Sequence, residues 1–215
     1  MVEETVATGR KTASASVSVP GSGRKPMPLS EIDTTKENRI SLNNAEVDRI
    51  LGGGLVEGSL VLIGGEPGIG KSTLLLQTIL GMSERRILYV SGEESERQIK
   101  LRAQRIGVNT DKLYILSETQ LSDIIATTEA LNPDILIIDS IQTMTTLAID
   151  STAGSVSQIR ECTSVLSTFA KSSGLLCPLT ISFSQILFPF LSVKPVYWQI
   201  VFSSTAYSSG LFWKM

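Results

Sequence analysis

Apolar runs alternate with amphipathic stretches along the middle of the chain. Four short runs are apolar throughout, as buried parallel strands are, and they predict strands at about 59–64, 87–91, 113–116 and 135–139. Between and around them apolar residues recur every three or four positions, which predicts helices at about 41–51, 73–80, 95–106, 121–131 and 155–171. This alternation favours an α/β fold, with a mainly parallel sheet flanked by helices on both faces.

The two ends of the chain differ from this middle part. Residues 1–35 are polar and rich in Ser, Thr, Pro and Gly, which is typical of a flexible arm. Residues 36–174 contain all of the predicted strands and helices, and we assign them to one core. Residues 175–215 carry only two charges and hold no period for long, so we interpret them as an atypical apolar tail, out of frame or disordered. Ile181 to Gln185 resembles a strand that ends in a polar residue, which we interpret as chance.

The tail is not predicted to cross a membrane. The stretch 175–193 is uncharged and nearly long enough to span a bilayer. However, Pro178, Pro189 and Gln185 make it a poor spanning helix. We therefore expect no membrane partner.

Composition excludes several classes of site. The chain has 215 residues, no His and two Cys, so it cannot build a His-based triad, a His metal site or a structural zinc site. A formal charge of −2 gives no overall basic field for nucleic acid, although a local basic face is compatible with it. Residues 1–30 lack an apolar signal core, so we expect a reduced, cytoplasmic protein.

One motif carries specific chemistry. An apolar run leads into a segment that fits the pattern G-x-x-x-x-G-K-[ST], and a helix-like run leads out of it. Its residues are Gly65, Glu66, Pro67, Gly68, Ile69, Gly70, Lys71, Ser72 and Thr73. Glycines let backbone N–H groups close round a phosphate at a helix N-terminus, which favours anions. We predict that Lys71 reaches the β- and γ-phosphates of ATP and that the Ser72 hydroxyl binds Mg²⁺.

Acidic residues follow two of the predicted strands. Hydrolysis needs a group that holds Mg²⁺ from its far side and a group that polarises water. Asp139 ends an apolar strand, and we predict that it makes the second Mg²⁺ contact through water. Glu93 and Glu94 follow another strand, and one of them is a candidate general base. Spacing alone does not choose between them.

Several motifs in order resemble a known family. Leu51 to Ser59 precedes the phosphate loop; after the loop come the segments 89–95, 98–103, 138–143 and 154–163. Together they closely resemble the bacterial RadA (Sms) family, a branch of the RecA-like P-loop ATPases. The resemblance covers about 27–174.

The resemblance implies a function and a site. It implies a DNA-dependent ATPase with a RecA-like core that forms a homo-hexameric ring and acts in DNA repair and recombination. There it drives branch migration or unwinding of recombination intermediates, with single-stranded or branched DNA and a recombinase as partners. The family pattern places the catalytic glutamate at Glu93. It also implies that the loop 140–154 faces DNA in the channel of the ring. That loop contains no Lys or Arg.

The chain also departs from the family pattern. The family's four-cysteine zinc module, its Lys-Asn-Arg-Phe-Gly motif and its Lon-like C-terminal domain are not visible, and the resemblance stops near Gly174. We therefore expect a core that is incomplete on the C-terminal side. Our hypothesis is a product truncated at both ends with a foreign tail, which resequencing the locus tests. Two alternative functions are a nucleotide-binding remnant with little turnover and another RecA-like helicase or ATPase.

Overall fold

The computed structural model describes residues 28–31 and 39–182. The chain divides into two units, 1–36 and 37–215. In the first unit the described residues form a short 3₁₀ helix, Leu29–Glu31. The rest of the predicted arm, and the predicted tail from residue 183 onward, lie outside the described residues.

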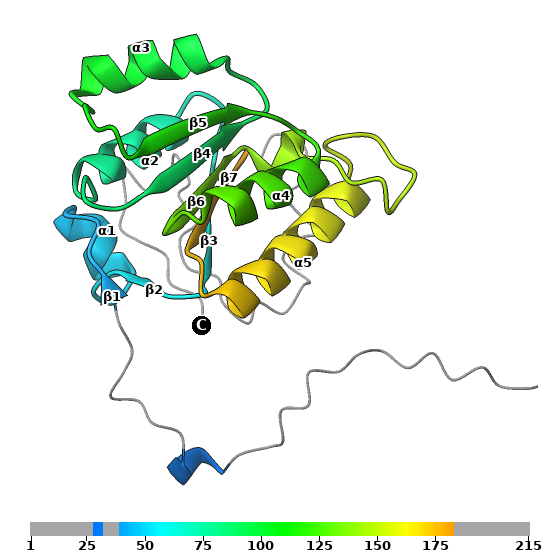
Figure 1. The fold of residues 1–215 in the computed structure, drawn as a ribbon, viewed down its shortest axis with the longest axis horizontal. Coiled ribbons are helices and arrows are strands. Elements are labelled where there is room, and N and C mark those ends of the chain that lie inside the picture. The colour runs from blue at the N-terminus through cyan, green and yellow to red at the C-terminus, as the bar shows by residue number, and fades with distance from the viewer. Residues whose placement is uncertain (1–27, 32–38, 183–215) are drawn as a thin grey trace, which may run out of the picture. The chain divides into compact units, whose positions relative to one another are not determined.

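The second unit is built on a five-stranded parallel sheet with the strand order β3-β7-β6-β4-β5 (Figure 1). Its strands are β3 (Leu60–Gly65), β4 (Ile87–Ser91), β5 (Leu113–Ser117), β6 (Ile135–Asp139) and β7 (Cys177–Ser182). Two short strands, β1 (Arg39–Ile40) and β2 (Leu55–Val56), form a separate antiparallel pair. The predicted α/β fold with a mainly parallel sheet is confirmed.

Five helices connect the described strands, close to the predicted positions. They are α1 (Ala45–Ile50), α2 (Lys71–Leu80), α3 (Glu96–Ile106), α4 (Leu121–Leu131) and α5 (Val156–Ser173). Local capping sets where they begin: the Asn44 side chain accepts the Val47 N–H at 3.2 Å, and Ser95 and Gln98 form a reciprocal capping box. Because Asn44 caps α1, this helix begins later than the predicted residue 41.

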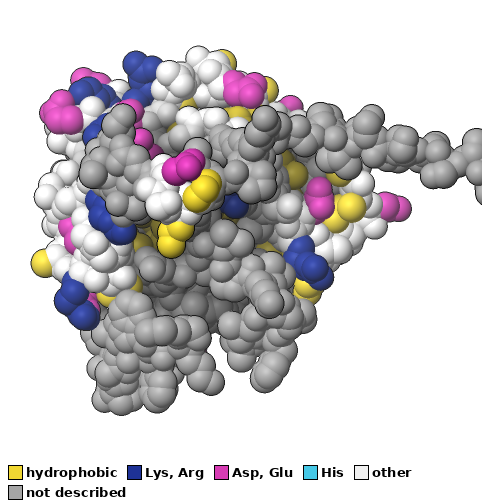
Figure 2. Space-filling view, turned by 90° about the horizontal axis from the view of Figure 1, so that it is seen from below, with side chains coloured by type: hydrophobic (Ala, Val, Ile, Leu, Met, Phe, Trp, Pro, Cys, Tyr) yellow, Lys and Arg dark blue, Asp and Glu magenta, His cyan; other side chains and the backbone are white. Residues whose placement is uncertain are grey.

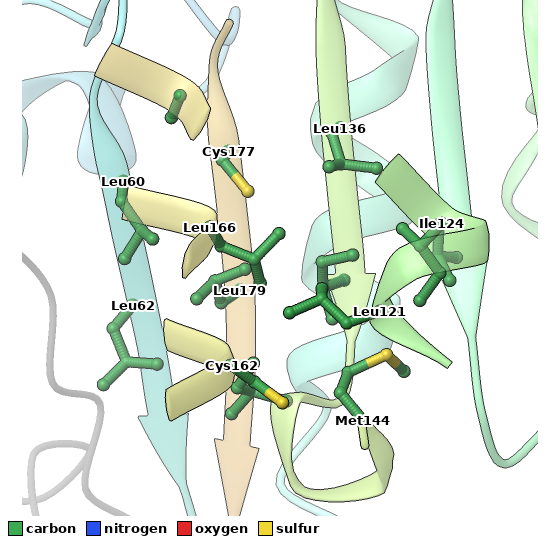
Figure 3. Packing of buried hydrophobic residues seen from close by; sticks show 14 of the residues in the cluster. Leu60, Leu62, Leu121, Ile124, Leu136, Met144, Cys162, Leu166, Cys177 and Leu179 are labelled. Atoms are coloured by element: carbon green, nitrogen blue, oxygen red, sulfur yellow. The ribbon is translucent and has the colours of Figure 1, made fainter. Parts of the chain in front are cut away.

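Side chains on the two faces of the sheet form two separate cores. One face packs against α4 and α5 through residues such as Ile124, Cys162 and Leu166. Figure 3 shows Cys162 and Leu166 near Leu179 of β7, and Ile124 on the side of Leu136 of β6. The other face packs against α1, α2 and α3. Since β6 is fully buried, helices on both faces exclude water from it, as its uninterrupted apolar sequence predicted.

The predicted boundary of the core at residue 174 is wrong for β7. This strand pairs with β3 from Leu60↔Cys177 to Gly65↔Ser182 and lies between the phosphate-loop strand and β6. Pro178 lies in this central strand although it lacks the N–H that a ladder needs. The Cys177 N–H donates to the Ser59 carbonyl on the β3 side. The next residue therefore turns toward β6, where the ladder is short and contains the single pair Ile138↔Leu179.

Candidate nucleotide site

The carboxyl ends of four parallel strands surround one cleft of about 350 Å³. Ligands of open α/β sheets bind at this edge of the sheet. The cleft is lined by Pro67, Gly68, Gly70, Lys71, Ser72, Thr73, Glu93, Glu94, Arg102, Asp139, Ser140, Thr180 and Ser182. The structure therefore brings the predicted loop together with Asp139 and both candidate glutamates.

The phosphate loop joins β3 to α2, as the motif predicted. Gly68 and Gly70 adopt φ values of 77° and 102°, which only glycine takes up without strain. A Cβ at either position would meet no atom within 4 Å, so backbone conformation rather than crowding requires glycine here. The loop residues 66–70 are exposed, and their backbone can be approached from the cleft.

Lys71 is the first residue of α2 and turns back over the loop. Its Nζ donates to the carbonyl oxygens of Gly65 at 3.1 Å and Glu66 at 2.9 Å. Partial burial lowers the pKa of Lys71, while the negative charges of Asp139 and Glu93 act in the opposite direction. Ser72 and Thr73 follow at the N-terminus of α2 and are half-buried.

Asp139 lies at the end of β6 and is 9 % exposed. Its Oδ2 accepts a hydrogen bond from the Tyr89 hydroxyl at 2.5 Å, and its Oδ1 accepts one from the Thr180 hydroxyl at 2.6 Å. Burial and the nearby Asp139 charge raise the pKa of Tyr89, so this hydroxyl stays protonated and donates.

The two glutamates after β4 have different partners. Both of their backbone N–H groups point at the Ser91 hydroxyl, which fixes the turn. Glu94 is bound to Arg102 in an ion pair. Glu93 instead accepts a hydrogen bond from the Ser140 hydroxyl at 3.0 Å. Glu93 thus contacts Ser140, the residue after Asp139, while the carboxylate of Glu94 is paired with the Arg102 guanidinium.

Sequence reasoning missed four residues that line the cleft, Arg102, Ser140, Thr180 and Ser182. It also missed Tyr89, which binds Asp139 from the neighbouring strand. A signal was present for Tyr89, since a phenol in a buried strand usually needs a hydrogen-bond partner. Thr180 carried no usable signal because β7 was not predicted.

The loop 140–154 is bound to α5 on both sides of an exposed tip. Gln158 of α5 is 2 % exposed, and its side chain binds backbone groups of the loop. Its Oε1 accepts the Thr146 N–H at 3.0 Å, and its Nε2 donates to the carbonyls of Thr146 at 3.1 Å and Ser151 at 2.9 Å. Leu147 is 89 % exposed. The loop therefore exposes the apolar side chain of Leu147 between two segments that are bound to α5.

Three properties of the described residues bear on possible partners: the distribution of charge, the hydropathy of the helices and the clustering of acidic and Cys side chains. On the face shown in Figure 2, the basic and acidic side chains of the described residues are interspersed and form no patch of one sign. The described part of the chain contains no helix with the length and apolar character that a membrane crossing requires. Within 28–31 and 39–182 no three acidic or Cys side chains cluster as a metal site, so a cation would depend on other ligands such as hydroxyls and phosphates.

Comparison with known proteins gives concordant matches. The family model described as "AAA domain" matches residues 26–180. The DNA repair protein RadA of Bacillus subtilis is 49 % identical over 81 % of this chain and 39 % of its own length. RadA of Streptococcus pneumoniae is 50 % identical over 75 % of this chain and 39 % of its length. The chain thus spans well under half the length of these relatives.

A solved structure shares the fold. The crystal structure of a KaiC-like protein from the archaeon Pyrococcus horikoshii matches with a TM-score of 0.56 and 25 % identity. The match covers 68 % of this chain and 71 % of that chain.

Proposed function

Because the chain belongs to the RadA family of RecA-like P-loop ATPases, we propose that its cleft binds ATP with Mg²⁺ and hydrolyses it. The observation that supports this most is the meeting of the phosphate loop, Asp139 and Glu93 in one cleft. These groups come from three different strand ends.

The residues of the cleft fit a nucleotide and a cation. The exposed backbone of the loop and the N-terminus of α2 suit phosphate oxygens, and the Lys71 ammonium is free to exchange its two carbonyl partners for phosphate. Ser72 and Asp139 supply the oxygen ligands that Mg²⁺ prefers, Asp139 through water. When bound, Mg²⁺ neutralises charge on the phosphates.

Glu93 is the general base of this proposal. It orients the attacking water and accepts its proton, while the Ser140 hydroxyl holds its carboxylate. Glu94 is less suited, because its ion pair with Arg102 stabilises the carboxylate and occupies one of its oxygens. Lys71 stabilises the negative charge that develops on the transferred phosphoryl group.

We extend the proposal to DNA repair, the role printed in the names of the RadA relatives. In this proposal copies of the chain assemble in a ring, and the loop 140–154 contacts DNA through backbone and hydroxyl groups. The loop starts at Ser140, the partner of Glu93, so a shift of the loop on DNA would act directly on the base.

The test compares nucleotide binding and ATPase rates with and without single-stranded DNA. We expect Lys71→Ala to abolish nucleotide binding, while Lys112→Ala, which removes an exposed lysine paired with Glu84, leaves it unchanged. Stimulation of hydrolysis by DNA supports the motor function. Binding without turnover supports the alternative of a nucleotide-binding remnant, and Lys71-independent binding contradicts the site itself.

A further inference from the structure

The Asp139 carboxylate is held from both sides by hydroxyl groups of the two neighbouring strands. Tyr89 is 1 % exposed and Thr180 is 0 % exposed, and each donates to a different oxygen of Asp139. We propose that Tyr89 and Thr180 are positioning residues that fix this carboxylate for Mg²⁺ with its bound waters. The inference rests on the ATP site proposed above.

The sheet topology explains how two distant residues reach one carboxylate. Tyr89 lies on β4 and Thr180 on β7, the two strands that flank β6. In the β4–β6 register Tyr89 pairs with Ile137, two residues before Asp139, so the phenol is on the same face and reaches along the strand. Ser91 pairs with Asp139 itself, but its hydroxyl accepts the N–H groups of the turn instead.

The chemistry of the two donors suits a cation site. A carboxylate has about four acceptor sites, and two hydroxyl donors leave about two of them for waters in the cleft. Both donors are neutral, so neither brings a positive charge next to the cation. Mg²⁺ demands near-ideal octahedral geometry, and hydrogen bonds that orient a metal-binding group typically change metal affinity about 10–100-fold.

The experiment measures how the affinity for a fluorescent ATP analogue depends on Mg²⁺ concentration. For Tyr89→Phe and Thr180→Val we expect the Mg²⁺ concentration at half-effect to rise about tenfold or more. In EDTA, which removes Mg²⁺, the affinity of both variants for the analogue should equal that of the unsubstituted protein. Thr180→Ser, which keeps the hydroxyl, should restore the Mg²⁺ dependence.

Matched controls remove the same groups elsewhere. Tyr114→Phe alters an exposed tyrosine of β5, and Thr128→Val removes a buried hydroxyl that donates to the Ile124 carbonyl in α4. Both should leave the Mg²⁺ dependence unchanged. Thermal unfolding confirms that each variant is folded.

The outcomes separate this inference from the function on which it rests. If the unsubstituted chain binds the analogue with Mg²⁺ and the Tyr89 and Thr180 variants show the same Mg²⁺ dependence, the positioning role is overturned alone. An equal loss of affinity with and without Mg²⁺ also overturns it, because the residues then shape the pocket rather than the cation site. If the unsubstituted chain binds no analogue, the proposed function fails as well.

Discussion

Gln158→Leu should loosen the loop 140–154 without unfolding the core. The side chain keeps its size but loses the amide that binds Thr146 and Ser151. A fourth contact, from Nε2 to the Ile149 carbonyl, is longer at 3.4 Å. Because Gln158 is 2 % exposed, its amide lies between the loop and α5 rather than in water.

The magnitude follows from the three shorter hydrogen bonds. At about 0.5–1.5 kcal/mol each they amount to about 1.5–4.5 kcal/mol. The loop residues they reach are half-buried, so water replaces part of this loss and about 2 kcal/mol remains. That free energy corresponds to about a 30-fold increase in local opening of the loop.

Native-state hydrogen exchange measures this opening directly. The Thr146 N–H donates to Gln158, so its exchange should accelerate about 30-fold in the variant while amides of β6 keep their protection. Gln104→Leu, on the exposed side of α3, is the matched control. Unchanged Thr146 exchange in Gln158→Leu would refute the view that this amide fixes the loop.

Two further predictions concern the base and a buried thiol. Glu93→Gln should keep ATP binding and lower the hydrolysis rate at least about 100-fold, and Glu94→Gln should lower it less; the reverse order in single-turnover assays would move the base to Glu94. Burial raises the pKa of the Cys177 thiol to about 12, against about 8.5 in an unfolded chain. Above a pH of about 8.5 the thiol ionises in the unfolded chain but stays protonated in the folded one. The free energy of unfolding should therefore fall as the pH rises, by at most about 1.4 kcal/mol per pH unit. Urea unfolding of Cys177→Ala should show a shallower loss between pH 8.5 and 10, and identical slopes would contradict the buried thiol.

The sequence predicted the parts of the fold whose local signals agree with their tertiary role. β4 and β6 were predicted at their observed bounds, because strands covered on both faces are apolar throughout. The phosphate loop was predicted in its strand and helix context for a similar reason, since its glycines serve local backbone conformation.

β7 shows where this reasoning ends. Its residues were assigned to the tail because that stretch is nearly uncharged and holds no period for long, whereas long-range pairing with β3 places them in the sheet. Missing β7 also hid Thr180, and with it half of the hydroxyl pair on Asp139. Spacing alone could not separate Glu93 from Glu94, because the ion pair that distinguishes them joins Glu94 to Arg102 on α3.

The most direct test of the account is a structure determined with Mg²⁺ and a non-hydrolysable ATP analogue. We expect phosphates against Gly65–Thr73 and the Lys71 ammonium, with Mg²⁺ bound by Ser72 and linked through water to Asp139. Glu93 should face the γ-phosphate. An analogue bound elsewhere, or phosphates on the loop with Asp139 and Glu93 turned away from them, would contradict the proposed ATPase site.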